Sequence, residues 1–433
     1  MVAPLTAFVR EQTTASLILV AATVTALIWA NSRWSDAYSA LFEMPVAISV
    51  GDAVLSLSLR HWISEGLMGL FFYLLGLEIK RELLAGELRD WRRSLPVACG
   101  AIGGMVVPTC LFLLIAAGTP QARGWGIPMA TDTAFAVGML ALLGGRVPAS
   151  VAAFVTALAI IDDLGAIVII AAFYSESLRA DALMVAFGLL ALLLFANLLG
   201  LRRGVFYVAV GALIWLALLR SGIHATVSGV LVAAVTPARP QRSPQWFVAR
   251  ANALLASFRN REDATPMLRD SKRHELAETM VESAQKATTP VQRWERLFEG
   301  PVSLLILPLF ALANAGIPID AEMLARAVRQ PLAQGIVLGL VVGKLCGITL
   351  GTWAALRSGA GRLPTGMRFP HVVGVGLIAG IGFTMSIFIS ELGFERQAES
   401  NIAKAAILVA SLIAGIAGYV WLRRVGHADA AAH

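Results

Sequence analysis

The chain has 433 residues, of which 57% are hydrophobic and 15% are charged. The charged share of soluble globular proteins is about 25%, so this composition excludes an ordinary soluble protein and predicts an all-α protein that crosses a membrane several times. The formal net charge of +7 does not indicate a nucleic-acid partner, because the basic residues lie between apolar runs, where they orient the chain in the lipid bilayer.

Twelve apolar segments predict twelve transmembrane helices in a single domain of residues 1–433. If the N-terminus is cytoplasmic, most of the 35 Lys and Arg residues fall on the cytoplasmic side, as the positive-inside rule requires. Both termini are therefore expected in the cytoplasm. The predicted helices are residues 14–31, 61–80, 94–117, 124–143, 151–174, 181–200, 204–219, 223–236, 301–318, 334–356, 371–391 and 402–422.

Two segments outside these helices have patterns of their own. Alternating apolar residues on both sides of Gly51-Asp52 predict a β-hairpin over 45–59, on the periplasmic side. A two-stranded hairpin is marginally stable alone, so it pairs either with a second copy of the chain or with its own subunit. The cytoplasmic loop 237–300 is rich in Pro, Arg, Ser and Thr, and we expect it to be mostly solvated and partly disordered, with a surface helix in HELAETMVESAQK.

Two adjacent carboxylates, Asp162 and Asp163, lie in the middle of the fifth predicted helix. An acidic side chain at the centre of a bilayer costs about 2.5–3.5 kcal/mol on insertion scales, so each is a functional candidate. Neighbouring side chains on a helix point about 100° apart. The two acids are therefore expected to have different partners.

A buried cation supplies one of those partners. Lys344 lies at the centre of the tenth predicted helix and needs an acid, which either Asp162 or Asp163 provides. The other acid is expected to face Asp132 across a small polar cavity, with Thr131 nearby. Oxygen ligands of this kind suit a hard cation such as Na⁺.

The charges of this predicted site suggest exchange. Two ionised carboxylates holding one Na⁺ keep one negative charge, whereas the doubly protonated pair is neutral. Protons and Na⁺ should therefore compete for the same oxygens. A site of this kind exchanges its ligands rather than carrying them together.

Two predicted helices contain interruptions. Pro128 and the Thr131-Asp132-Thr133 cluster weaken the fourth, and Gly380-Ile381-Gly382 weakens the eleventh. Broken helices are tolerated within a membrane where they line a cavity, and they present helix ends to an ion. The alternative for each is a kink used only for packing.

Other ionisable groups lie near the ends of the predicted helices. Glu78, Glu82 and Glu295 are at cytoplasmic ends, where charges that simply reach the interface are the alternative to a functional role. His224 lies near the opposite, outer end of its helix, where it is either a pH sensor or a structural residue.

Six sequence blocks together resemble the NhaA family of bacterial Na⁺/H⁺ antiporters: ATDTAFAVGMLALLG, ALAIIDDLGAIVIIA, LGLEIKREL, SGIHAT, LPLFALANAG and GIGFTMSIFI. The resemblance implies two inverted three-helix repeats, at about 94–174 and 334–422, and two broken helices that cross near the ion site. It also implies a homodimer held by the hairpin in the bacterial inner membrane.

The resemblance further implies roles for individual residues. Asp163 and Asp132 would bind the ion and the proton, with Thr131 beside them, and Asp162 would pair with Lys344. The activity would be electrogenic, pH-regulated exchange of two inward protons for one outward Na⁺ or Li⁺, by a carrier rather than an enzyme and without a cofactor. The residues implied in the pH response are Glu78, Glu82, His224 and Glu295.

The chain departs from the expected family pattern at a few positions. Glu65 stands where we expect Asp, Arg296 and Glu299 stand where we expect His, and the 237–300 loop is longer than expected. These differences affect the expected pH threshold, whereas every expected residue of the transport site is present.

Three other functions use similar features. A membrane aspartyl protease should have a Gly-x-Gly-Asp element, but Gly382 is followed by Phe383. A cation channel requires a ring of ligands, which one cavity with a neutralised acid does not supply. A sodium-coupled solute symporter is the closest rival. It needs a second, larger polar pocket, for which the predicted helices offer few polar groups.

Overall fold

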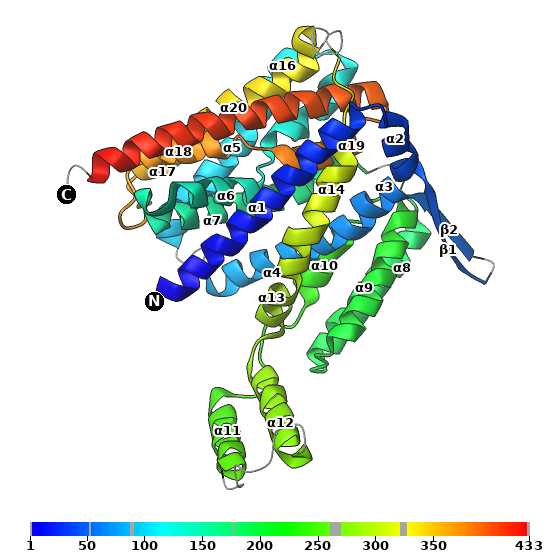
Figure 1. Cartoon of the computed structure of the whole chain (residues 1–433), viewed down its shortest axis with the longest axis vertical. Helices are drawn as coiled ribbons and strands as arrows, with labels where there is room; N and C mark the ends of the chain where they lie inside the picture. Colours follow the sequence, from blue (N-terminus) through cyan, green and yellow to red (C-terminus); the bar gives the residue numbers. More distant parts are fainter. Residues whose placement is uncertain are drawn as a thin grey trace.

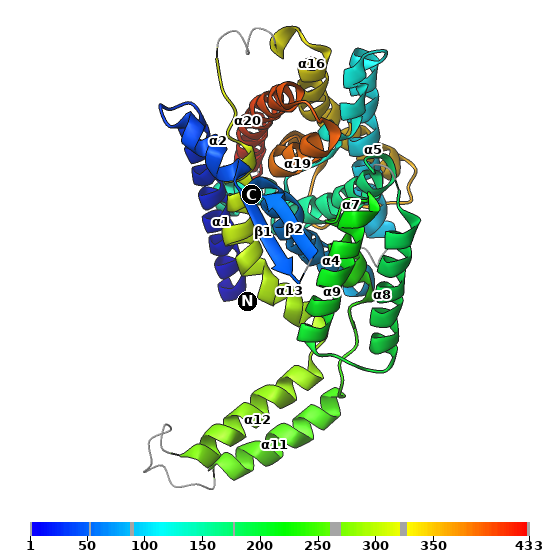
Figure 2. The same ribbon diagram turned by 90° about the vertical axis from the view of Figure 1, so that its right-hand side faces the viewer.

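The computed structural model describes residues 2–51, 53–86, 91–175, 178–259, 270–320 and 327–430. Its helices form a bundle with a two-stranded hairpin at one edge and a pair of helices projecting from one end (Figures 1 and 2). Within these residues, nine helices are long and apolar enough to cross a membrane, and two bent helix pairs raise the number to eleven. The chain is therefore a multi-pass membrane protein.

Three of the nine spans contain a π-helical turn, a widening that is frequent at functional sites. The three spans with a π-helical turn are α3–η1–α4 (Leu59–His61, Trp62–Leu67, Met68–Ala85), α13–η6–α14 (Pro290–Pro301, Val302–Ile306, Leu307–Asn314) and α16–η7–α17 (Pro331–Leu338, Gly339–Gly343, Lys344–Arg357). The other six are single helices: α1 (Val2–Ala30), α5 (Trp91–Ala116), α7 (Ala149–Phe173), α8 (Ala180–Leu198), α9 (Gly204–Ser221) and α20 (Gln397–Ala430).

Both predicted interruptions are present as bends between half-helices. η3 (Pro120–Met129) meets α6 (Thr133–Leu143) and the short η4 (Gly144–Arg146) at 41°, and α18 (Phe369–Ile378) meets α19 (Phe383–Gly393) at 46°. Each bent pair lies between two spans, α5 and α7 for the first pair and α16–α17 and α20 for the second. This order, span, broken helix, span, is the one expected of the three-helix repeats at 94–174 and 334–422. The inverted symmetry itself stays a prediction.

The eighth predicted transmembrane helix is shorter than expected. Its residues form α10 (Val227–Val235), which has nine residues, whereas a bilayer requires about 20. The expected number of twelve spanning helices is therefore not confirmed.

The predicted hairpin forms as two antiparallel strands, β1 (Pro45–Val50) and β2 (Ala53–Ser58). Val46 is opposite Leu57 and Ile48 is opposite Leu55, as the alternating pattern requires. Asp52 of the predicted turn lies outside the described residues. The hairpin follows α2 (Ser35–Glu43) and lies along the edge of the bundle (Figure 1). A hydrogen bond of 3.0 Å from Trp62 Nε1 to Val46 O attaches it to the following span.

The 237–300 segment contains more helix than we expected. α11 (Pro244–Arg259) and α12 (Ser271–Ala287) pack side by side and project away from the bundle (Figures 1 and 2). The predicted surface helix lies within α12, which Asp270 caps by accepting a hydrogen bond from Arg273 N. Residues 260–269 lie outside the described part, so partial disorder stays a prediction.

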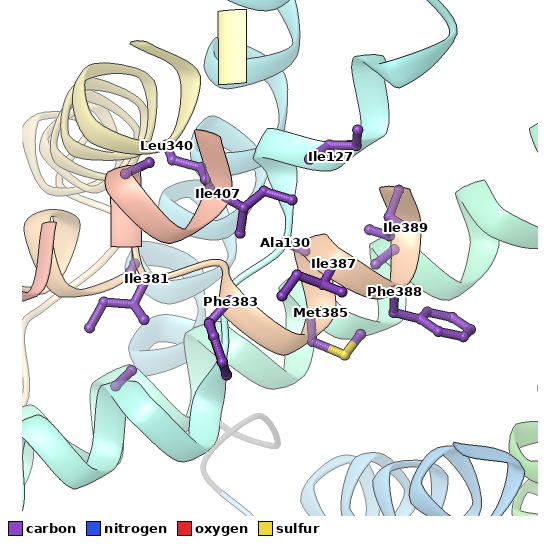
Figure 3. Close-up of a cluster of buried hydrophobic side chains, with 14 of the residues drawn as sticks. Ile127, Ala130, Leu340, Ile381, Phe383, Met385, Ile387, Phe388, Ile389 and Ile407 are labelled. Carbon is purple, nitrogen blue, oxygen red and sulfur yellow. The ribbon is translucent and has the colours of Figure 1, made fainter. Parts of the chain in front are cut away.

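The apolar core surrounds the two bends. Side chains of η3, η7, α19 and α20 meet there (Figure 3). Close to this core, α5 and α17 touch backbone to backbone. A Cβ on Gly347 would lie 2.1 Å from Gly103 O, so only glycine allows this approach. The contact fixes the position of the neighbouring Lys344 along α17 relative to α5.

Candidate functional site

The two bends meet each other in the middle of the bundle. Asp132 N donates to Ile381 O at 2.7 Å, and the Thr131 hydroxyl lies 3.0 Å from Ala379 O. The break predicted at Gly380 and Gly382 is the one between α18 and α19. A Cβ on Gly380 would lie 2.4 Å from Leu340 O, which explains why a glycine is needed there.

Asp132 joins the N-termini of two half-helices. Its Oδ1 accepts a hydrogen bond from Phe135 N at 3.1 Å and caps α6. Its Oδ2 accepts hydrogen bonds from the backbone N–H of Thr384, at 3.0 Å, and from the Thr384 hydroxyl at the start of α19. A carboxylate is favourable at a helix N-terminus, because unpaired N–H groups and the helix dipole point toward it.

The two adjacent acids of α7 have different partners. Lys344 Nζ lies 2.6 Å from Asp162 Oδ2, and the Thr131 hydroxyl lies 2.9 Å from the same oxygen. Asp162 and Lys344 are both fully buried. A buried acid with a cation and a hydroxyl at one oxygen is a neutralised structural unit.

Asp163 faces a cavity instead. Its Oδ2 accepts a 3.4 Å hydrogen bond from the Thr133 hydroxyl, and its Oδ1 has no hydrogen-bond partner among the described residues. The side chain is only 2% exposed. A carboxylate oxygen buried without a protein donor is free to bind a proton or a cation.

The cavity has a volume of about 370 Å³ and runs from Asp132 and Asp163 to an exposed rim. Asp132, Asp163, Thr133, Thr156 and Thr384 line its deep part. At about 30 Å³ of liquid volume per water molecule, it has room for a hydrated cation. Charged and polar groups form the rest of its polar lining: Glu78, Arg81, Gln292, Glu295, Arg296, Glu299 and Ser303.

The sequence matches the family model described as Na⁺/H⁺ antiporter 1 over residues 6–422. The Na⁺/H⁺ antiporter NhaA of Oleidesulfovibrio alaskensis is 46% identical to this chain, covering 98% of it and 94% of the relative. The relative named Na⁺/H⁺ antiporter NhaA 2 from Psychromonas ingrahamii is 44% identical, covering 97% of this chain and 89% of its own. The chain belongs to the Na⁺/H⁺ antiporter 1 family.

Thr131, which we expected near this family site, lies beside the acids but does not line the cavity. It is fully buried, and its hydroxyl donates to Asp162. The cavity hydroxyls come from Thr133 and Thr384. Thr384 lies two residues after the predicted interruption at Gly380-Ile381-Gly382, at the start of α19, and its contact with Asp132 was not predicted.

The residues expected in the pH response of this antiporter-family chain do not form one cluster. Glu78 and Glu295 line the cavity, and Arg81 joins Glu295 at 2.9 Å and Glu82 at 3.1 Å. His224 lies elsewhere. Its ring nitrogens are 3.3 Å from Glu65 Oε1 and 2.8 Å from Tyr174 O.

A second buried ion pair was not predicted. Lys404 of α20 pairs with Glu391 at the end of α19, and Lys404 is fully buried. In the sequence, both residues fall at the edges of apolar runs, where a charge usually reaches the interface. The fold of the antiporter-family chain brings them together inside the bundle.

Proposed function

We propose that this protein exchanges Na⁺ or Li⁺ for protons across the bacterial inner membrane, with Asp163 and Asp132 as the shared binding site. Family membership supports Na⁺/H⁺ antiport. The observation that carries the proposed mechanism is the contrast between the neighbours on α7. Each acid has one oxygen, Oδ1, without a hydrogen-bond donor among the described residues, but Asp162 is neutralised by Lys344 and does not line the cavity, whereas Asp163 lines the cavity.

In this proposal, protons and Na⁺ compete for the same carboxylate oxygens. When Na⁺ lies between ionised Asp163 and Asp132, Thr133 and Thr384 offer neutral oxygens beside it. When both acids are protonated, the site is neutral and the cation leaves. Exchange of two protons for one Na⁺ then moves net charge, so transport is electrogenic.

Alternating access couples this competition to movement across the membrane, and the ion gradients set the direction of net exchange. The cavity opens at the end of the bundle that carries Glu78 and Glu295. We assign this end to the cytoplasm, together with both termini, from the distribution of Lys and Arg. Na⁺ enters from there and leaves on the hairpin side, and protons travel inward.

Charged groups at the cavity rim supply the proposed pH regulation. Arg81 pairs with Glu82 and Glu295, and Glu78, Arg81 and Glu295 line the cavity, so the charge of this group sets the charge at the entrance. Arg296 and Glu299 occupy positions where the family resemblance predicts His. We therefore expect carboxylates rather than imidazoles to set the pH threshold at this rim. His224, with Glu65, would respond separately.

The test is transport by the purified protein in proteoliposomes with no organic solute present. An outward Na⁺ gradient should drive proton uptake, and a potential-sensitive dye should report net charge movement. A sodium-coupled symporter would move no protons under these conditions, and it would move Na⁺ only after its solute is added. Equal flux with and without a potential clamp would contradict electrogenic exchange.

A further inference from the structure

The ion pair between Glu391 and Lys404 joins two helices that the transport site depends on. Glu391 lies in the last turn of α19, and Lys404 lies in α20. Ser400 Oγ donates a 3.1 Å hydrogen bond to Glu391 Oε1. The Glu391 side chain is 23% exposed, whereas the Lys404 side chain is 1% exposed. The pair thus lies at the edge of the bundle, with the Lys404 ammonium group buried and the Glu391 carboxylate partly exposed.

Each charge of the pair depends on the other. A carboxylate in the last turn of a helix is disfavoured by the helix dipole, so Glu391 does not stabilise α19 by itself. A buried ammonium group needs an anionic partner, and Glu391 is the acid that pairs with Lys404 in the described part of the chain. Loss of either charge therefore releases the end of α19 from α20.

The opposite end of α19 holds the transport site. Thr384 contacts Asp132 there, and every residue from Phe383 to Ser390 is buried. Thr384 and Glu391 are about two helical turns apart. α19 is therefore a short rigid rod, held by Asp132 at one end and by Lys404 at the other, so displacement of its far end moves Thr384.

The pair lies away from the cavity opening. The cavity reaches Thr384 but is not lined by Glu391 or Lys404. Arg60, whose charge acts on both members of the pair, lies at the foot of the hairpin. Arg60 and Glu78 belong to one span and are about 27 Å apart along it. The pair and the cavity opening thus lie at opposite ends of the bundle.

We propose that Glu391 and Lys404 are positioning residues for the exchange: their ion pair holds α19 so that the site is closed toward the hairpin side, and it separates when the site opens there. The inference rests on the proposed antiport. It assigns to this pair the step that exposes Asp163 and Asp132 to the second side of the membrane.

The test uses a single reporter cysteine. Cys99, Cys110 and Cys346 are replaced by Ser, and Ser390, which is buried and whose hydroxyl donates to Ile387 O in the same helix, is replaced by Cys. A membrane-impermeant maleimide is then added from the hairpin side. We expect slow labelling with the native pair and labelling on the order of tenfold faster in Glu391→Gln, because a minor open state is enriched.

Further variants separate positioning from stability. The charge swap Glu391→Lys with Lys404→Glu should return labelling toward the native rate. If Glu391→Gln does not fold, Ser400→Ala keeps both charges, removes one hydrogen bond and should give a smaller increase. The control is Asp181→Asn, which breaks an exposed 2.7 Å pair with Arg179 and should change nothing.

Transport kinetics provide the second readout. Because the state open to the hairpin side remains the minor one, the cavity-open population falls only slightly in Glu391→Gln, and the apparent KM for Na⁺ on the cavity side should rise by that small factor. A merely structural pair would lower the amount of active protein and leave KM and labelling unchanged. Unchanged labelling in Glu391→Gln, in a parent that transports, overturns this inference alone. A parent without Na⁺-dependent proton flux overturns the proposed function instead.

Discussion

Adjacent residues on α7 show how strongly a local environment decides the role of a carboxylate. Asp162 and Asp163 have the same chemistry, the same depth and neighbouring positions. Asp162 accepts from Lys344 and Thr131 at one oxygen, whereas Asp163 is directed into the cavity. The difference in direction was predictable from helix geometry. The choice of partner followed only from the family resemblance, because it depends on where α17 packs.

Asp162→Asn should destabilise the protein without touching the cavity. It leaves the fully buried Lys344 without its carboxylate, and breaking a buried pair in this way costs about 3–5 kcal/mol. Denaturant titration of the purified protein measures the loss in the free energy of unfolding. Adding Lys344→Gln should restore much of it. A single variant as stable as Asp181→Asn would contradict the structural role of this pair.

At the scale of elements, the sequence predicted local features well and contacts between distant segments poorly. Pro128, Gly380 and Gly382 are residues that weaken helices wherever they occur, so both bends were predictable from the sequence. The contact of Asp132 with Thr384 joins residues 252 positions apart, and no local pattern can show it. The same limit applies to Glu391 and Lys404, whose charges meet only after α19 and α20 have packed.

The contact between α5 and α17 is a testable consequence of this packing. Gly347→Ala places a Cβ 2.1 Å from the backbone oxygen of Gly103, where no side chain can move aside. We expect a loss of about 1–3 kcal/mol in the free energy of unfolding, as for other overpacked sites, and slower transport because Lys344 shifts.

The matched control is Gly188→Ala in α8, where a Cβ meets nothing within 4 Å. This substitution should leave transport unchanged and be neutral or slightly stabilising, because alanine favours a helix. If Gly347→Ala and Gly188→Ala have equal free energies of unfolding, α5 and α17 can move apart enough to accept a Cβ, which would contradict the tight contact.

In the whole molecule, the hairpin lies at the edge of the bundle that holds the site, and the α11–α12 pair projects from its end (Figures 1 and 2). The hairpin was predictable because alternation and a turn are local signals. The α11 helix was not, since its mixed composition resembles that of a solvated loop. Neither element lines the cavity, so each can serve another purpose.

We expect the hairpin to join two copies of the chain. β1 and β2 form a sheet of only two strands, so both outer edges lack a strand partner within the described chain. Replacing residues 45–58 by a short Gly-Ser linker should convert a dimer into a monomer, measured by light scattering during gel filtration in detergent. A dimer that persists after the replacement would assign the interface to another surface.

In the proposed mechanism, Na⁺ and protons compete for Asp163. The direct test is proton release from inside-acid everted vesicles on addition of Na⁺ or Li⁺, at several pH values, for the parent, Asp163→Asn and the control Asp181→Asn. Na⁺ should release the proton gradient in the parent and the control, with a higher apparent KM at lower pH, and not in Asp163→Asn. Undiminished exchange in Asp163→Asn, or an apparent KM for Na⁺ that does not depend on pH, would contradict this mechanism.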